Sequence, residues 1–150
     1  MGKLLNEIAI NADPETIWNI LANPVLLEKY DPTVRKSVLI STQKTGLGTK
    51  RKVDMLDGKN WFEEVITDFE PGKLLTFELT ACSFPIHGLK HTYTFEKKGR
   101  QTIVKQVMEY TVKFGFLGKI MDTLMIRKQT GSGIKKFFEG LKQFAEKQYI

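Results

Sequence analysis

Apolar and polar residues alternate along much of the first 113 positions, with the period of two that indicates β-strands buried on one face. Short segments containing glycine, proline or aspartate divide this alternation into pieces of strand length. The pattern predicts seven strands, at residues 4–11, 34–43, 49–56, 59–69, 74–80, 89–97 and 100–113. Because the last six follow one another through short connections, we expect neighbouring strands to pair antiparallel.

Two proline pairs between the first and second strands predict short helices. In Asp13-Pro14 the proline suits the first helical position, and the aspartate side chain is able to cap the free amides. Asn23-Pro24 repeats this arrangement, and Asp31-Pro32 ends the second helix after Tyr30. We therefore expect two short helices directly after the first strand.

The apolar period changes from two to 3.6 near the C-terminus, which predicts a long helix from Leu117 to Gln148. Gly131-Ser132-Gly133 interrupts this helix, and two interpretations are open. The glycines bend or break the helix, or they allow it to pack closely on the sheet. The predicted apolar stripe consists of Leu117, Ile120, Met121, Leu124, Ile134, Phe138, Leu141 and Ala145.

The turns also predict which side chains lie opposite each other. We place two-residue turns at Asp57-Gly58, Pro71-Gly72 and Lys98-Gly99. Each resulting register gathers apolar residues on one face of the sheet. The predicted pairs are Arg51 with Glu64, Val53 with Phe62, Ile66 with Phe77, Glu64 with Leu79, Tyr93 with Val104, His91 with Gln106, and Leu89 with Met108.

The inner face of this sheet is mostly apolar but includes polar side chains. A closed core rarely contains unpaired Arg, Glu or His, whereas a ligand cavity combines apolar walls with a few converging polar groups. We therefore predict an internal pocket. The alternative is that Arg51 and Glu64 pair at a wet sheet edge while His91 and Gln106 satisfy each other. The predicted inner face comprises Arg51, Val53, Met55, Phe62, Glu64, Ile66, Phe77, Leu79, Leu89, His91, Tyr93, Phe95, Val104, Gln106, Met108 and Tyr110.

Composition fits one globular domain, which we expect to span residues 1–150. Hydrophobic residues make up 41% and charged residues 27% of the chain, which argues against disorder. Much of the net charge of +6 lies at residues 117–148, which hold seven basic and three acidic side chains. This basic helix is interpreted as a solvated face, or as a surface that binds RNA, a ribosome or an anionic membrane.

Several classes of chemistry find no support in the sequence. Cys82 is the only cysteine, so an intrachain disulfide is excluded. Its spacing to His87 and His91 fits no zinc pattern, and neither a phosphate-binding glycine loop nor a nucleophile elbow is present. We expect no metal or cofactor, and no DNA partner. Without a signal peptide or an apolar run of membrane-spanning length, we expect a cytoplasmic protein, monomeric or weakly dimeric.

The order of the predicted elements resembles that of the START-like superfamily with the helix-grip fold. Within it, the chain is similar to the polyketide cyclase/dehydrase and lipid-transport branch, also known as SRPBCC. The segments that carry this resemblance extend over the whole chain, and their order and spacing matter more than any one of them. They are Ile8-Ala9-Ile10-Asn11-Ala12-Asp13-Pro14-Glu15, Ile17-Trp18, Leu21, Asn23-Pro24, Tyr30-Asp31-Pro32, Gly48-Thr49-Lys50-Arg51, Glu64-Val65-Ile66, Phe69-Glu70-Pro71, Tyr93-Thr94-Phe95, Phe114-Gly115 and Leu117-Gly118.

The resemblance implies a sheet that grips the C-terminal helix around a hydrophobic tunnel. Members of such families bind lipids, polyketides, hormones or quinones, and a minority catalyse cyclisation or dehydration. Glu64 matches a recurrent inward glutamate, and Tyr30 matches a recurrent aromatic residue before Asp-Pro. The superfamily has no shared catalytic motif, so the resemblance assigns no catalytic residue.

These observations predict an α+β helix-grip domain in which a seven-stranded curved antiparallel sheet wraps a long C-terminal helix, with two short helices after the first strand. The leading hypothesis is binding or transport of a small hydrophobic molecule, lipid- or polyketide-like, in the cavity. The alternative is a cyclase or dehydratase that uses Glu64 and His91 as acid and base. The predicted ligand contacts are Tyr30, Arg51, Val53, Phe62, Glu64, Ile66, Phe77, Leu79, His91, Tyr93, Gln106, Met108, Tyr110, Met121, Leu124 and Met125.

Overall fold

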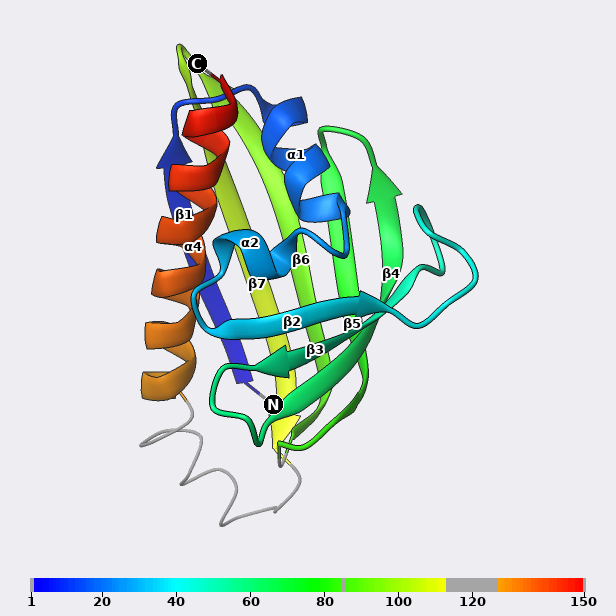
Figure 1. The fold of residues 1–150 in the computed structure, drawn as a ribbon. Helices are drawn as coiled ribbons and strands as arrows, with labels where there is room; N and C mark the ends of the chain where they lie inside the picture. Colours follow the sequence, from blue (N-terminus) through cyan, green and yellow to red (C-terminus); the bar gives the residue numbers. More distant parts are fainter. Residues whose placement is uncertain (1, 85, 113–126, 150) are drawn as a thin grey trace.

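Seven antiparallel strands form a curled sheet, and the C-terminal helix lies on its concave side, in front of β1 in Figure 1. A computed structural model of the protein describes residues 2–84, 86–112 and 127–149. The spatial order of the strands is β1-β7-β6-β5-β4-β3-β2, which confirms the predicted fold class. The elements are β1 (Gly2–Ile10), α1 (Pro14–Ala22), α2 (Leu27–Tyr30), β2 (Val34–Leu39), β3 (Lys50–Met55), β4 (Trp61–Glu70), β5 (Leu74–Cys82), β6 (Ile86–Lys98), β7 (Gln101–Val112) and α4 (Arg127–Tyr149).

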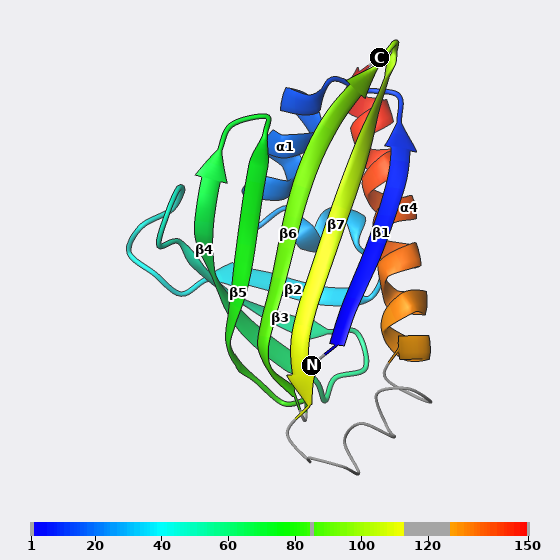
Figure 2. The same cartoon turned by 180° about the vertical axis from the view of Figure 1, so that it is seen from behind.

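The curl of the sheet produces a concave side and a convex side. In Figure 1, β2 and β3 cross in front of the long strands β5, β6 and β7. The described helices all lie on the concave side, and Figure 2 shows the convex side without a helix over it. The helix α4 contacts β1, α1 and α2, so the helices and the sheet enclose the space between them.

The helix α1 anchors one end of this enclosure. It starts at Pro14, as the sequence predicts, and buries Ile17, Trp18, Ile20 and Leu21 along one face. The indole Nε1 of Trp18 donates a hydrogen bond to the carbonyl oxygen of Leu74 at 3.1 Å. This buried aromatic residue therefore fixes α1 to the start of β5.

Two predicted details of the short helices are wrong. The side chain of Asp13 makes no capping hydrogen bond, and its Oδ1 lies 3.1 Å from Nζ of Lys97 instead. The second helix begins only at Leu27, because Oδ1 of Asn23 accepts a hydrogen bond from the amide of Val25 at 3.2 Å. That local turn competes with the helix that the proline was expected to start.

The helix α4 runs without a break through Gly131-Ser132-Gly133, so the predicted break at these glycines is wrong. A Cβ atom at Gly131 or Gly133 would meet no atom of a described residue within 4 Å, so neither glycine packs closely against the described sheet. The close approach is at Gly140, where a Cβ would lie 1.8 Å from the carbonyl oxygen of Tyr30. Residues 117–126 of the predicted helix lie outside the described residues.

The apolar stripe of α4 packs as the 3.6-residue period predicts. Ile134, Phe138, Leu141 and Ala145 are each at most 7% exposed. Phe137 and Phe144 flank this stripe and contact the ring of Tyr30 at centroid distances of 5.9 and 5.8 Å. Tyr30 thereby holds α2 against α4.

Two of the three predicted registers are confirmed. In the first hairpin, Arg51 lies opposite Glu64 and Val53 opposite Phe62. In the second, Ile66 lies opposite Phe77, as predicted. The turn itself differs, because Glu70 pairs with Leu74 across three residues and not across the predicted two. A β-bulge between Ile66 and Asp68 compensates for that extra residue, since a bulge shifts the register by one.

The predicted register of the third hairpin, between β6 and β7, is wrong by two residues. Tyr93 lies opposite Gln106 and His91 opposite Met108, because the turn is Gly99-Arg100. Gly99 has a φ of 63°, and tight hairpin turns require such a positive φ at their first central position. The slip is even, so every side chain keeps its predicted face.

Candidate functional site: an internal cavity

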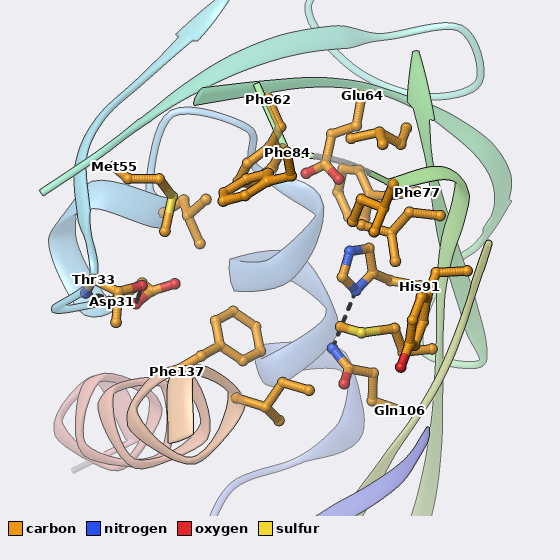
Figure 3. A pocket seen from close by; sticks show the side chains of 18 of the residues that line it. Asp31, Thr33, Met55, Phe62, Glu64, Phe77, Phe84, His91, Gln106 and Phe137 are labelled. Carbon is orange, nitrogen blue, oxygen red and sulfur yellow. Dashed lines mark hydrogen bonds between the residues drawn. The ribbon is translucent and has the colours of Figure 1, made fainter. Parts of the chain in front are cut away.

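A cavity of about 450 Å³ lies between the concave face of the sheet and α4 (Figure 3). It is within the size range of small-molecule sites. Most of its wall is apolar, with polar side chains grouped at a few places. The lining residues are Leu27, Asp31, Thr33, Arg51, Met55, Phe62, Glu64, Phe77, Leu79, Phe84, Ile86, Leu89, His91, Tyr93, Gln106, Met108, Tyr110, Gly133, Ile134 and Phe137.

The lining comes from three parts of the fold. Alternate positions of β3 to β7 supply the sheet wall, because every second side chain of a strand points to the same face. Phe137 projects from α4 toward that wall, and Asp31 and Thr33 stand on a separate side of the cavity (Figure 3). Phe62 and Phe84 lie together at its upper boundary in this view. The five strands, α4 and the segment between α2 and β2 must therefore all be in place before the site exists.

Ten of the predicted contact residues line the cavity, three described ones do not, and three fall where the structure is not described. Tyr30, Val53 and Ile66 are at most 6% exposed and belong to the core behind the wall. Met121, Leu124 and Met125 lie outside the described residues. The ten that line it are Arg51, Phe62, Glu64, Phe77, Leu79, His91, Tyr93, Gln106, Met108 and Tyr110.

Sequence reasoning missed part of the lining. Leu27, Asp31 and Thr33 belong to the segment that was interpreted only as a helix and its stop. Gly133, Ile134 and Phe137 come from α4, where the apolar stripe does point to Ile134 but not to its neighbour Phe137. Phe84 and Ile86 flank the β5–β6 connection, and their apolar character between two strands was the available signal.

A buried ion pair forms the polar part of the sheet wall. Nε and Nη2 of Arg51 lie 2.7 and 2.6 Å from Oε1 of Glu64, and these two residues are 7% and 2% exposed. The alternative that Arg51 and Glu64 pair at a wet sheet edge is therefore right that they pair, but wrong that the pair is exposed to water. The guanidinium carbon also lies 4.2 Å from the ring centroid of Phe77.

Electrostatics keep the guanidinium of Arg51 charged. Burial alone would lower the pKa of Arg51, but the adjacent carboxylate of Glu64 outweighs burial and raises that pKa. The guanidinium therefore stays protonated in the cavity wall. Burial is also the main reason that the pKa of Tyr30 and that of Tyr93 are raised, so both phenols stay neutral.

Gln106 connects the second polar group on the wall. Its Nε2 donates to Oη of Tyr93 at 3.0 Å and lies 3.5 Å from Nδ1 of His91. Its Oε1 accepts from Nδ2 of Asn6 at 3.4 Å, which fixes the orientation of the amide. The predicted contact between His91 and Gln106 is thus present, and the same amide nitrogen of Gln106 also bonds to Tyr93.

His91 makes stability depend on pH. Burial lowers its pKa below 6.5, only partly opposed by Glu64, so its imidazole is neutral at pH 7. Above pH 6.5 the imidazole is mostly neutral in both the folded and the unfolded state. Below pH 6.5 the unfolded state binds the proton first, so the free energy of unfolding falls. We expect His91→Gln to lose less unfolding free energy than the parent between pH 7.5 and pH 5.5 in urea titrations.

The control for this prediction is the exposed His87, since His87→Gln should leave the acid loss unchanged. Asp31 has the opposite effect on the pH dependence of stability. Burial raises the pKa of its carboxyl group, and the hydrogen bonds from Thr33 lower it only in part. Comparing each variant with the parent cancels that contribution. An identical acid loss in His91→Gln and the parent would contradict the burial of the imidazole.

The described residues contain no group of three His, Cys, Asp or Glu side chains placed to hold a metal ion. None of the described helices is long and apolar enough to cross a bilayer. Lys135 and Lys136 are exposed on α4, while Lys142 pairs with Glu146, and the basic-surface hypothesis stays a prediction.

Comparison with known proteins agrees with this architecture. The family model described as "Polyketide cyclase / dehydrase and lipid transport" matches residues 1–146. A search of curated proteins found no match. Among solved structures, the chain is similar to XoxI of Bacillus cereus, at 17% identity with a TM-score of 0.77, covering 95% of this chain and 94% of that one.

Two further structures extend the likeness to other organisms. A START superfamily protein of Mycobacterium smegmatis has a TM-score of 0.79 at 13% identity, covering 97% of this chain and 98% of that one. The major latex-like protein 151 of Panax ginseng has a TM-score of 0.71 at 15% identity, covering 99% and 97%. Such identities establish a shared fold, and the START description of the mycobacterial protein agrees with the resemblance found from sequence.

Proposed function

The chain belongs to the polyketide cyclase/dehydrase and lipid-transport family, and from this premise we propose that it binds a small, mainly apolar molecule in the internal cavity. The observation that carries the proposal is the unfilled volume of about 450 Å³ in the centre of the fold. A core of this size would ordinarily be filled by side chains, since protein interiors pack densely. Binding or transport of a lipid- or polyketide-like ligand is the function that this space supports best.

The walls of the cavity suit a flat or flexible hydrophobic ligand. Phe62, Phe77, Phe84 and Phe137 surround the space with aromatic surface, and Met108 adds an adaptable side chain. Phe62 and Phe84 are half-buried, whereas Phe77 and Met108 are buried.

A pair of glycine variants tests the proposal. Gly133 lines the cavity and Gly131 does not, and an added Cβ at either position would meet no atom within 4 Å in the part of the chain that the structure describes. Both substitutions to leucine should raise helix propensity by roughly 0.5–1 kcal/mol. Only Gly133→Leu places new atoms in the cavity.

We expect the neutral fluorescent dye N-phenyl-1-naphthylamine to bind the parent and Gly131→Leu equally, and Gly133→Leu at least about tenfold more weakly, a loss of about 1.4 kcal/mol. Fluorescence titration measures all three affinities, and urea unfolding checks that both variants are as stable as the parent. Equal dye affinity in the two variants, or no uptake by any of the three proteins, would refute a ligand-binding cavity.

Catalysis on the same cavity is the second candidate, and one observation favours it. The neutral imidazole of His91 and the carboxylate of Glu64 both project from the sheet wall into the cavity (Figure 3). A cyclase or dehydratase needs a proton acceptor and a proton donor beside a sheltered substrate. Tyr93 is close to His91, with a ring-centroid distance of 6.5 Å.

The catalytic candidate requires that turnover depends on these groups while binding does not. Dehydration of a β-hydroxyketone, followed by NMR, should fall roughly 100-fold or more in Glu64→Gln and His91→Phe, with dye affinity retained. Absence of turnover by the parent, with intact dye binding, would leave the carrier function alone. The cytoplasmic location and the monomeric or weakly dimeric state stay predictions.

A further inference from the structure

The side of the cavity away from the sheet wall carries one carboxyl group, that of Asp31. This residue follows the last turn of α2 and is only 8% exposed. Its Oδ1 accepts hydrogen bonds from both the amide and the hydroxyl of Thr33, at 2.9 and 2.7 Å. Figure 3 shows the carboxyl group directed into the cavity, across the open space from His91.

The second oxygen of this carboxyl group, Oδ2, is left unused by the fold. It accepts a hydrogen bond from none of the described residues, since both bonds from Thr33 go to Oδ1. It is also not among the unpartnered side-chain atoms that are sealed inside the described part of the protein, so a molecule in the cavity is able to reach it. Ending α2 requires Oδ1 alone. Because buried polar atoms are ordinarily hydrogen-bonded, Oδ2 marks a place for a donor from the ligand.

The charges of the lining indicate what kind of donor fits. Among the described lining residues, the guanidinium of Arg51 is already neutralised by Glu64, and the imidazole of His91 is neutral. In its ionised form Asp31 therefore leaves this lining with one negative charge more than it has positive charges. Burial raises the pKa of Asp31, while the hydrogen bonds from Thr33 and the charge of Arg51 favour the carboxylate. A cation beside Oδ2 would stabilise that carboxylate further.

A protonated amine supplies a donor and the missing positive charge in one group. An anionic group at the same place would instead meet an unbalanced carboxylate in a site shielded from water, which is costly. We propose that the ligand is an apolar amine whose ammonium group pairs with Asp31, while its hydrophobic body lies against the aromatic wall formed by Phe62, Phe84 and Phe137. This inference rests on the proposed function and adds the chemical class of the ligand.

Four probes with one skeleton test the inference by displacement of N-phenyl-1-naphthylamine at pH 7. 2-Methylnaphthalene has no polar group, 2-naphthalenemethanol is a neutral donor, 2-naphthylmethylamine is a cation, and 2-naphthoate is an anion. We expect the amine to bind the parent at least about tenfold more tightly than 2-methylnaphthalene, because charge-assisted hydrogen bonds are the strong ones. The alcohol should lie between them, and the naphthoate should bind most weakly.

Two variants connect the preference to Asp31. Asp31→Asn keeps a side-chain oxygen for the bonds from Thr33 and removes the negative charge. It should abolish the advantage of the amine over 2-methylnaphthalene and leave the affinity for 2-methylnaphthalene unchanged. Glu70→Gln is the matched control, because it makes the same change of net charge at an exposed residue outside the cavity lining. The amine should keep its advantage in this control, since a distant exposed charge is screened by salt.

A measurement on the parent protein decides the matter if Asp31→Asn does not fold. The carboxyl carbon of Asp31, assigned by through-bond NMR, reports directly on a charge placed beside it. Its resonance should move on addition of 2-naphthylmethylamine and stay in place with 2-methylnaphthalene at equal saturation. A resonance that responds equally to both probes would overturn the inference.

The outcomes separate the two proposals. Binding of 2-methylnaphthalene without a preference for the amine, or with a preference for the alcohol or the naphthoate, would overturn the pairing with Asp31 and leave the cavity function standing. An amine preference that survives in Asp31→Asn, or that is lost equally in Glu70→Gln, would also overturn it. Failure of every probe, 2-methylnaphthalene included, would remove the proposed function and the inference together.

Discussion

Gly140→Ala is expected to destabilise the protein by about 3 kcal/mol or more, although alanine is the better helix former by about 1 kcal/mol. The reason is the crossing of α4 over the end of α2. A Cβ at Gly140 would lie 1.8 Å from the carbonyl oxygen of Tyr30 and 2.9 Å from its carbonyl carbon. Backbone atoms cannot move aside as a flexible side chain does, so α4 must shift away from α2.

The matched control is Gly131→Ala on the same helix. An added Cβ there meets no atom of residues 2–84, 86–112 or 127–149 within 4 Å, so we expect helix propensity to decide and stability to rise by up to about 1 kcal/mol. Urea unfolding of the two variants measures both signs. A stabilised or unchanged Gly140→Ala would show that α4 does not cross α2 at this point, and the cavity wall that α4 provides would then be misplaced.

Removing one member of the buried ion pair is expected to have the second large effect. Arg51→Met leaves the carboxylate of Glu64 buried without a counter-charge, and Glu64→Leu leaves the guanidinium in the same state. Each single variant should lose about 3–5 kcal/mol of unfolding free energy. The double variant should fall within about 1 kcal/mol of the parent, since apolar pairs often replace buried ion pairs at little cost.

The double-mutant cycle separates this explanation from general damage to the core. A coupling energy of several kcal/mol is expected, with the double variant more stable than either single one. Additive losses would mean that the two side chains act independently. Small losses in both single variants would mean that water reaches the pair, which is the wet-edge arrangement that the structure contradicts.

The alternation of strands made the sheet wall predictable from sequence. Arg51, Glu64 and Phe77 were placed on one face because a strand exposes every second side chain to the same side. The β6–β7 register was wrong by two residues, yet His91 and Gln106 still face the cavity, because an even slip preserves the face. The prediction of faces was therefore more robust than the prediction of partners.

The remaining wall could not be predicted in the same way. Phe137 faces the cavity, whereas its neighbour Phe138 is buried in the core, and that choice depends on how α4 is rotated on the sheet. Asp31 reads in the sequence as part of a helix stop, and its place in the wall depends on where the α2–β2 connection meets the curled sheet. Both are properties of tertiary packing, which local periodicity does not contain.

The central claim is that the concave side of the sheet holds a space that an apolar ligand occupies. A crystal structure of the protein soaked with N-phenyl-1-naphthylamine tests it most directly. The account predicts density for the dye between Phe62, Phe84 and Phe137, with Arg51 and Glu64 still paired beside it. Side chains that fill this space completely, with the dye absent or bound only on the outer surface, would contradict the account.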